Sequence, residues 1–197
     1  MRHALTPLLS LLLLAVGPIV AETLDGRVVS VADGDTITIL DDAQVRHRIR
    51  LAAIDAPEKG EPFGERSKQN LSQLVYGKVV RVDWQKQDRD GCLIGTVWAE
   101  SPDMPCRDLP SCPKTLDAGL AQITVGLAWH FKRHADEQEP QQRGQYEFAE
   151  IEARAKKVGL WSDPNPVPLP DGPAGMLDAA TVAEVRARQR FRPAGRR

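Results

Sequence analysis

The sequence predicts an α+β fold that is mainly β. From residue 23 to residue 99 apolar and polar residues mostly alternate, with turn residues between the runs, as in strands buried on one face. Apolar residues at helical spacing then mark segments 115–124 and 140–158. A further helical segment, 65–75, separates the third expected strand from the fourth. Five short strands interrupted in this way are typical of a small closed barrel of the OB type with flanking α-helices.

Three arginines follow one another on one face of the expected strand 46–51. Successive side chains of a strand point to opposite sides, so Arg46, Arg48 and Arg50 share a face. For the same reason Ile49 and Leu51 are expected to point into the core. The other expected strands are 28–31, 36–39, 80–84 and 92–99.

Each expected helix has one apolar side. Helix 140–158 ends in Lys156 and Lys157, with Gly159 directly after it, which is a common C-terminal pattern. The residues expected to face the core are Leu71, Leu74 and Val75 in the first helix, Leu116, Leu120 and Ile123 in the second, and Phe148, Ile151, Ala155 and Val158 in the third.

Composition is that of an ordinary globular chain. Of 197 residues, 42% are hydrophobic and 27% are charged, which excludes collagen, coiled coil and wholesale disorder. The 26 Lys and Arg residues balance 27 Asp and Glu residues, so the formal net charge is −1. No overall positive field attracts nucleic acid. Any affinity for a polyanion must therefore come from the local placement of charge.

Residues 1–21 are predicted to be a signal peptide. Arg2 and His3 precede the apolar run Leu8–Val16, and Ala21 is a small residue at a suitable cleavage point. This run is shorter than the about 20 apolar residues of a transmembrane helix, although an uncleaved anchor is the alternative. We therefore expect an exported protein, either periplasmic or secreted.

The expected domain, 22–163, is followed by a segment of different character. Five prolines lie between residues 164 and 173, and six arginines lie between residues 186 and 197. Residues 164–197 are therefore interpreted as a Pro-rich linker and a basic tail. The tail is either a solvated end or an electrostatic contact for nucleic acid or an anionic membrane. A weaker hypothesis is that the protein is an exported scaffold and that this Pro-rich and Arg-rich segment is its functional part.

Export would place the three cysteines in an oxidising setting, where disulfides persist. Cys106 and Cys112 flank a short stretch that a disulfide could close, which leaves Cys92 as an odd thiol. A pairing of Cys92 with Cys106 or Cys112 is the alternative. No pair of cysteines has the C-x-x-C spacing of a zinc site.

Acidic residues gather after two of the expected strands. Asp33-Gly34-Asp35 follows the first strand, and Asp55-Ala56-Pro57-Glu58 follows the arginine-bearing strand. Carboxylate oxygens suit a hard divalent cation, and an arginine such as Arg50 can hold a phosphate. A glutamate outside the ligand set can take a proton from an attacking water. These residues are the minimum for metal-assisted phosphodiester hydrolysis, although ordinary turn acids and a solvated arginine would have the same spacing.

Four motifs follow one another between residues 24 and 161. They are Val31-Ala32-Asp33-Gly34-Asp35-Thr36, Arg50-Leu51-Ala52-Ala53-Ile54-Asp55-Ala56-Pro57-Glu58, Gly126-Leu127-Ala128 and Gly159-Leu160-Trp161. This order resembles the staphylococcal-nuclease-like (thermonuclease) family. The resemblance implies an OB-fold barrel and a calcium-dependent endonuclease that hydrolyses DNA and RNA, preferably single-stranded, with low sequence specificity. We expect a monomer without a stable protein partner.

The same resemblance implies a role for each motif residue. Glu58 would act as the general base for the attacking water, or help to position it. Arg50 would bind the scissile phosphate and stabilise its developing charge. The implied calcium ligands are the carboxylates of Asp35 and Asp55 and the backbone carbonyl of Ala56, with Asp33 behind them.

One position departs from the family pattern. After the turn that corresponds to Asp88-Arg89-Asp90-Gly91 the family has an arginine that also contacts the phosphate, whereas this chain has Cys92. Removing such an electrostatic contact commonly costs about 10²–10³ in rate. Reduced activity is therefore expected, with Arg89 or Arg48 as partial substitutes. The alternative is a non-catalytic OB-fold module that binds nucleic acid.

Two weaker signals lie between residues 129 and 134. His130 and His134 are four residues apart, but no third ligand is evident nearby, so surface histidines are expected rather than a zinc site. Trp129 and Phe131 either stack on bases or pack in the core.

Overall fold

The computed structural model describes residues 22–102 and 112–163. The predicted signal peptide, Cys106 and the Pro-rich and Arg-rich segment 164–197 lie outside the described residues. Within the two described ranges, no helix has both the length and the apolar character needed to cross a membrane.

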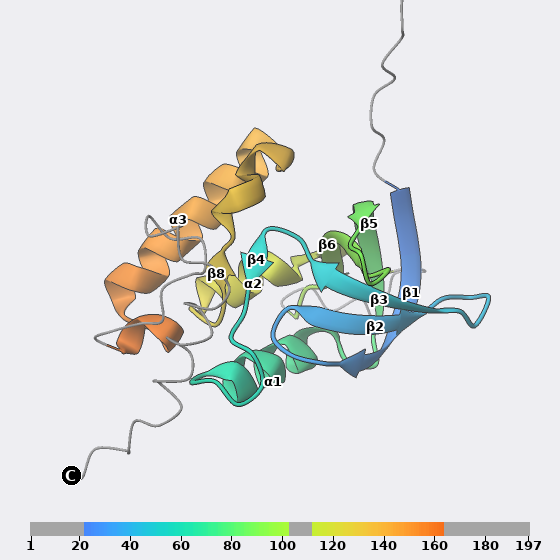
Figure 1. The fold of residues 1–197 in the computed structure, drawn as a ribbon, viewed down its shortest axis with the longest axis horizontal. Helices are drawn as coiled ribbons and strands as arrows, with labels where there is room; N and C mark the ends of the chain where they lie inside the picture. Colours follow the sequence, from blue (N-terminus) through green and yellow to red (C-terminus); the bar gives the residue numbers. More distant parts are fainter. Residues whose placement is uncertain (1–21, 103–111, 164–197) are drawn as a thin grey trace, which may run out of the picture.

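Five strands close into a barrel, which confirms the expected mainly β architecture of the OB type (Figure 1). Neighbouring strands pair in antiparallel fashion in the order β3-β2-β1-β5-β6, and a parallel pairing of β3 with β6 closes the barrel. The barrel strands are β1 (Glu22–Val31), β2 (Thr36–Leu40), β3 (Arg46–Leu51), β5 (Val79–Gln87) and β6 (Leu93–Glu100).

Three short strands connect the barrel to the rest of the chain. β7 (Lys114–Asp117) extends the sheet beside β6. β4 (Ile54–Asp55) pairs with β8 (Trp129–His130), so that Asp55 lies opposite Trp129. This small pairing holds the segment after β3 against the helical half of the molecule.

In Figure 1, α1 lies below β2, and α3 lies farthest from β1. Helix α2 contacts both α1 and α3 and so joins the helical layer together. The helices are α1 (Gly64–Val75), α2 (Ala118–Thr124) and α3 (Pro140–Lys156), with the 3-10 helices η1 (Lys132–Glu137) and η2 (Gly159–Ser162).

The core follows the alternation of the strands. Ile49 and Leu51 are buried, whereas the three arginines of β3 are exposed, as predicted. Each fully buried aliphatic side chain contributes roughly 1.5–3 kcal/mol relative to an exposed one. The barrel side chains that are almost inaccessible to solvent include Val28, Ile37, Ile39, Val80, Val82 and Val97.

The prediction that residues 115–124 form one helix is wrong at its start. Leu116 and Asp117 pair with Ala99 and Trp98 as part of β7. The helix begins only after Asp117, whose side chain accepts hydrogen bonds from the backbone N–H groups of the next turn. An N-cap aspartate of this kind sets the start of a helix more strongly than apolar spacing does.

The predicted core face of the third helix is also wrong. Phe148 and Ile151 are each 63% exposed. The buried positions of α3 are Tyr146, Ala149, Glu150 and Ala153. The Tyr146 hydroxyl donates to Asp117, and Glu150 pairs with Lys132 and Arg154. The buried face of α3 therefore includes polar side chains, and the spacing of apolar residues predicted a different face.

Candidate functional site

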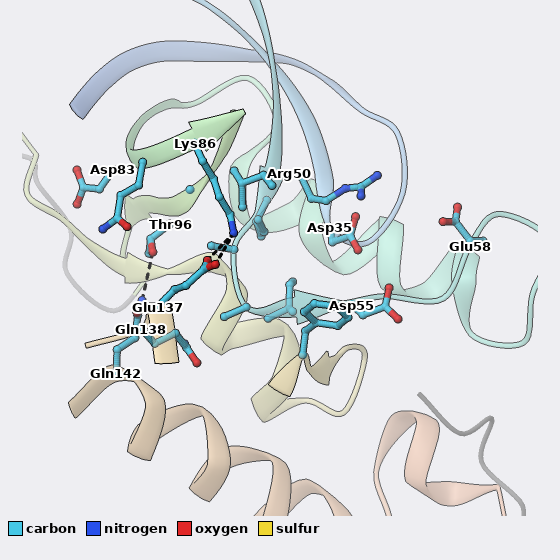
Figure 2. Close-up of a pocket in the computed structure, with 18 residues that line it drawn as sticks. Asp35, Arg50, Asp55, Glu58, Asp83, Lys86, Thr96, Glu137, Gln138 and Gln142 are labelled. Atoms are coloured by element: carbon cyan, nitrogen blue, oxygen red, sulfur yellow. Dashed lines mark hydrogen bonds and ion pairs between the residues drawn. The ribbon is translucent and has the colours of Figure 1, made fainter. Parts of the chain in front are cut away.

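A pocket of about 380 Å³ opens between the barrel and the helical layer (Figure 2). Four of the residues singled out in the sequence line it together. Asp35 comes from the turn before β2, Arg50 from β3, Asp55 from β4 and Glu58 from the loop that follows. Segments separated in the chain therefore bring two acidic motifs and an arginine to the same end of one pocket.

Asp35 is fixed by hydrogen bonds to two different segments. Its backbone carbonyl accepts from the N–H of Leu51 at 2.8 Å. Its carboxylate accepts from the Thr36 hydroxyl at 2.8 Å and from the N–H of Ala56 at 3.1 Å. Asp35 thus links the end of β3 to the segment that follows β4.

Asp33 supports this arrangement without lining the pocket. Its carboxylate accepts a hydrogen bond from the backbone N–H of Asp35 at 3.1 Å, an interaction typical of aspartate in a tight turn. Asp33 therefore contacts Asp35 through the Asp35 backbone N–H and is not itself a lining residue of the pocket.

A buried amide that sequence reasoning missed holds the same turn from the helical side. Gln122 of α2 is inaccessible to solvent and donates to the Gly34 carbonyl at 2.7 Å and to the Ser67 carbonyl at 3.0 Å. Ser67 of α1 donates in turn to the Leu127 carbonyl at 2.7 Å. The only signal in the sequence was a polar residue next to Ile123 on an otherwise apolar helix.

The second acidic motif spans β4 and the loop after it. Asp55 is partly buried, Ala56 is 3% exposed, and Glu58 is exposed at the mouth of the pocket. The N–H of Glu58 donates to the carboxylate of Glu61 at 2.9 Å, and this bond orders the loop. The Glu58 side chain lines the pocket.

The electrostatics of this end of the pocket favour a bound cation. Burial, and then the neighbouring Asp33 carboxylate, raise the pKa of Asp35 to about 8. The Asp55 carboxylate adds to the rise, which shows that the two pocket carboxylates repel each other. A cation held between them would remove this repulsion and favour the charged form of both.

Calcium fits this donor set. Hard divalent cations prefer carboxylate and carbonyl oxygens, and they complete their coordination with water. Asp35 and Asp55 supply carboxylates to the pocket, whereas Ala56, directly after Asp55, is buried and is not among the lining residues. Across the described residues no cluster of three or more His, Cys, Asp and Glu side chains is placed to hold a metal, so such a cation would rest on two carboxylates.

Cys92 does not take the place of a second arginine in the pocket. The side chain is a free thiol, 2% exposed, and it is not among the pocket residues. Burial, and then the Asp88 carboxylate, raise the pKa of the thiol, so it carries no charge near neutral pH. The alternative in which Cys92 forms a disulfide is wrong, whereas Cys112 is disulfide-bonded.

The structure corrects the expectation for one histidine. His130 is inaccessible to solvent rather than on the surface, because it lies in β8 with its ring against Tyr146 and hydrogen-bonded to Gln138. Trp129 is also buried and packs in the core. Phe131, by contrast, lines the pocket.

The far end of the pocket is polar and was not predicted (Figure 2). Lys86 of β5 donates to the carboxylate of Glu137 in η1 at 2.7 Å. Gln142 of α3 donates to the Thr96 hydroxyl of β6 at 3.2 Å. These pairs join elements that are far apart in the chain, so no local sequence pattern predicts them.

The closed barrel and its pocket, which is lined by two carboxylates and an arginine, define the class of protein. It is an OB-fold protein with an acidic site. The family model described as "Staphylococcal nuclease homologue" matches residues 48–163. The chain therefore belongs to the staphylococcal nuclease family.

Curated relatives cover most of the chain. A protein from Escherichia coli called "Protein ParB" is 42% identical over 144 residues, which are 73% of this chain and 76% of the relative. "Micrococcal nuclease" from Shigella flexneri is 37% identical over 140 residues, 71% of this chain and 75% of the relative. An "Uncharacterized endonuclease" from Escherichia coli O157:H7 is 36% identical over 152 residues, 77% of this chain and 86% of the relative.

We expect Gly34→Ala to destabilise the fold by about 1–3 kcal/mol, the usual cost of overpacking. A Cβ at this position would overlap Ser67 Oγ and lie 2.7 Å from Ala56 Cβ. The matched control is Gly144→Ala in α3, where a Cβ meets nothing within 4 Å. It should stabilise the helix by roughly 0.5–1 kcal/mol. Urea denaturation of both variants checks this, and a Gly34→Ala protein as stable as wild type would contradict it.

In the metal-free protein, the contribution of Asp35 to stability should fall as pH rises from about 4 to about 8. The folded state keeps the Asp35 proton up to a pKa of about 8, whereas the unfolded chain releases it near 3.8. The folded state therefore binds more protons in this window, and stability falls with pH. Thermal melts in chelator would measure this against Asp35→Asn, which lacks the titrating group. Equal pH slopes for the two proteins would show that the Asp35 shift is absent.

Proposed function

We propose that this protein is an exported, calcium-dependent endonuclease that hydrolyses phosphodiester bonds of DNA and RNA with low sequence specificity. The observation that carries the proposal is the meeting of Asp35, Arg50, Asp55 and Glu58 at one end of a single pocket. Membership of the staphylococcal nuclease family supports it, as do relatives whose names describe a nuclease and endonucleases.

The proposed calcium ligands are the carboxylates of Asp35 and Asp55 and the backbone carbonyl of Ala56. Calcium bound there would supply positive charge beside the phosphate oxygens as negative charge develops on them. Asp33 holds the Asp35 turn through the Asp35 N–H and so keeps the ligand oxygens oriented.

The side chains at the pocket mouth take the other roles. Glu58 is exposed and free to accept a proton from a water near the phosphate, as a general base must. Arg50 offers two parallel N–H donors to the phosphate, and this planar fork stabilises charge as the water attacks. Leu51, Ile54 and Ile94 line the adjoining wall and limit the access of bulk water to this end.

Low sequence specificity follows from a site built around the phosphodiester group. Contacts to phosphate oxygens position a strand without reading its bases. The proposed substrate is single-stranded nucleic acid, and the proposed enzyme is a monomer that acts after export to the periplasm or the medium. The predicted signal peptide at residues 1–21 is the observation that supports export.

Reduced activity is part of the proposal. Cys92 is neutral and buried where the family pattern has an arginine, so the pocket has a single arginine among its lining residues in the described chain. This same feature favours the second candidate function, a non-catalytic OB-fold module. Such a module would bind nucleic acid in a salt-dependent manner without turnover.

Glu58→Gln is expected to lower the calcium-dependent cleavage of denatured DNA by about 10²–10⁴-fold, the usual contribution of a general base. Arg50→Ala should lower it by about 10²–10³-fold, because a charge-stabilising contact is lost. The matched control is Glu65→Gln, an exposed carboxyl in α1 outside the pocket, which should cleave at the wild-type rate. Cleavage that both pocket variants leave unchanged would rule out the proposed mechanism.

Cys92→Arg is expected to raise the cleavage rate by about 10²–10³-fold if the protein is an attenuated nuclease. Cys92→Ser, which keeps the size and adds no charge, should leave the rate unchanged. Circular dichroism melts would show that both variants are folded, since position 92 is buried. A folded Cys92→Arg protein without any gain would favour the non-catalytic module.

A further inference from the structure

The outer face of β3 carries three exposed arginines in line. Arg46, Arg48 and Arg50 alternate with the half-buried His47 and the buried Ile49. Alternate side chains of a strand are about 6.6–6.8 Å apart, since each residue rises by about 3.3–3.4 Å. We call these three residues the arginine stripe. Only its last member, Arg50, lines the pocket.

The stripe has no carboxylate partner within the described part of the chain. Other arginines there do: Arg81 pairs with Asp83 at 3.3 Å, and Arg154 pairs with Glu150 at 3.2 Å. Among residues 22–102 and 112–163, the carboxylate that pairs with β3 is that of Asp41, which binds His47 on the opposite face of the strand. Like charges on one face of a strand repel each other, so an anion bound along the stripe would be stabilised.

The registers of both neighbouring strands set the direction of the stripe. On β2, Thr36 lies opposite Arg50 and Thr38 lies opposite Arg48. Because Thr36 directly follows Asp35, the stripe starts beside the proposed calcium site and runs away from it. The stripe ends at Arg46, opposite Leu40 near the turn between β2 and β3.

On the other side of the stripe, the parallel pairing with β6 places residues 92–94 beside the arginines. The parallel register pairs Ile49 with Leu93 and Arg50 with Ile94, which places Cys92 next to Arg48. The positive charges of Arg48 and Arg50 act on the Cys92 thiol, as expected for guanidinium groups close to it. Cys92 itself carries no charge, and the nearby Asp88 carboxylate is held by a hydrogen bond from the Cys92 N–H at 2.8 Å.

We propose that Arg48 and Arg46 bind the phosphates that follow the cleaved one along a single strand of nucleic acid, with Arg50 on the scissile phosphate. This inference rests on the proposed function for the identity of the polyanion. The step between stripe residues is comparable with the step between phosphates of an extended strand, and a basic groove that tracks the backbone is how single strands are held. The chain has a net charge of −1, so such local placement supplies the attraction.

The test measures binding apart from cleavage. The probe is a dye-labelled single-stranded oligodeoxynucleotide, titrated by fluorescence anisotropy in chelator at several salt concentrations. Arg48→Ala and Arg46→Ala should each reduce the slope of log affinity against log salt by about 0.7, the value for one phosphate contact on a single strand. That slope corresponds to about fivefold weaker binding at 0.1 M salt. Arg48→Lys, which keeps the charge, should retain the slope.

The matched control is Lys156→Ala, which removes one positive charge from an exposed position on α3. It should leave the salt slope at the wild-type value. An equal loss of slope in Lys156→Ala and Arg48→Ala would overturn the inference, because net charge alone would then explain the effect. A wild-type slope in Arg48→Ala, or no binding by the wild-type protein at low salt, would also overturn it.

Cleavage of two substrates separates this inference from the proposed function. A dinucleoside monophosphate has one phosphate, so in Arg46→Ala the ratio of kcat/KM for the oligonucleotide to kcat/KM for this dinucleotide should fall about fivefold. Equal losses on both substrates would contradict a role at neighbouring phosphates. If the wild-type protein binds through the stripe but cleaves neither substrate, the proposed function fails and the phosphate-binding stripe stands.

Discussion

The candidate site depends on the hydrogen bonds that Asp35 makes to two separate segments. Its carbonyl accepts from Leu51 at the end of β3, and its carboxylate accepts from Ala56 after β4. These bonds set the Asp35 carboxylate between the strand that carries Arg50 and the loop that carries Glu58. Gln122 holds the preceding turn from α2. Barrel and helical layer must therefore come together before the acidic groups share a pocket.

The charges of the site conflict with one another in the absence of ligands. Asp33 and Asp55 disfavour the charged form of Asp35, and three arginines on β3 have no carboxylate partner among the described residues. Unfavourable charge interactions of this kind are expected at functional sites, where the rest of the fold offsets their cost in stability. A cation beside the acids and a phosphate beside the arginines would resolve both conflicts together. Because the acidic residues and the arginines lie next to each other, a metal ion and a phosphodiester would bind side by side at this site.

The features that were predicted correctly from the sequence are those that neighbouring residues determine. The alternation of β3 correctly placed Ile49 inside and Arg48 outside, because a period of two is built into a strand. The core face of α3 was missed because Tyr146 and Glu150 are buried through partners distant in the chain. Gln122 was missed for the same reason. The acidic motifs were found by their order along the chain, whereas spacing alone did not distinguish them from ordinary turns.

Calorimetric titration of calcium into the protein tests most directly whether the pocket carboxylates form a cation site. We expect a single site for wild type, and loss of that site in Asp55→Asn. Glu65→Gln, an exposed carboxyl outside the pocket, should bind like wild type. Calcium binding that Asp55→Asn leaves unchanged, or no binding by wild type, would contradict the assignment of Asp35 and Asp55 as the ligands.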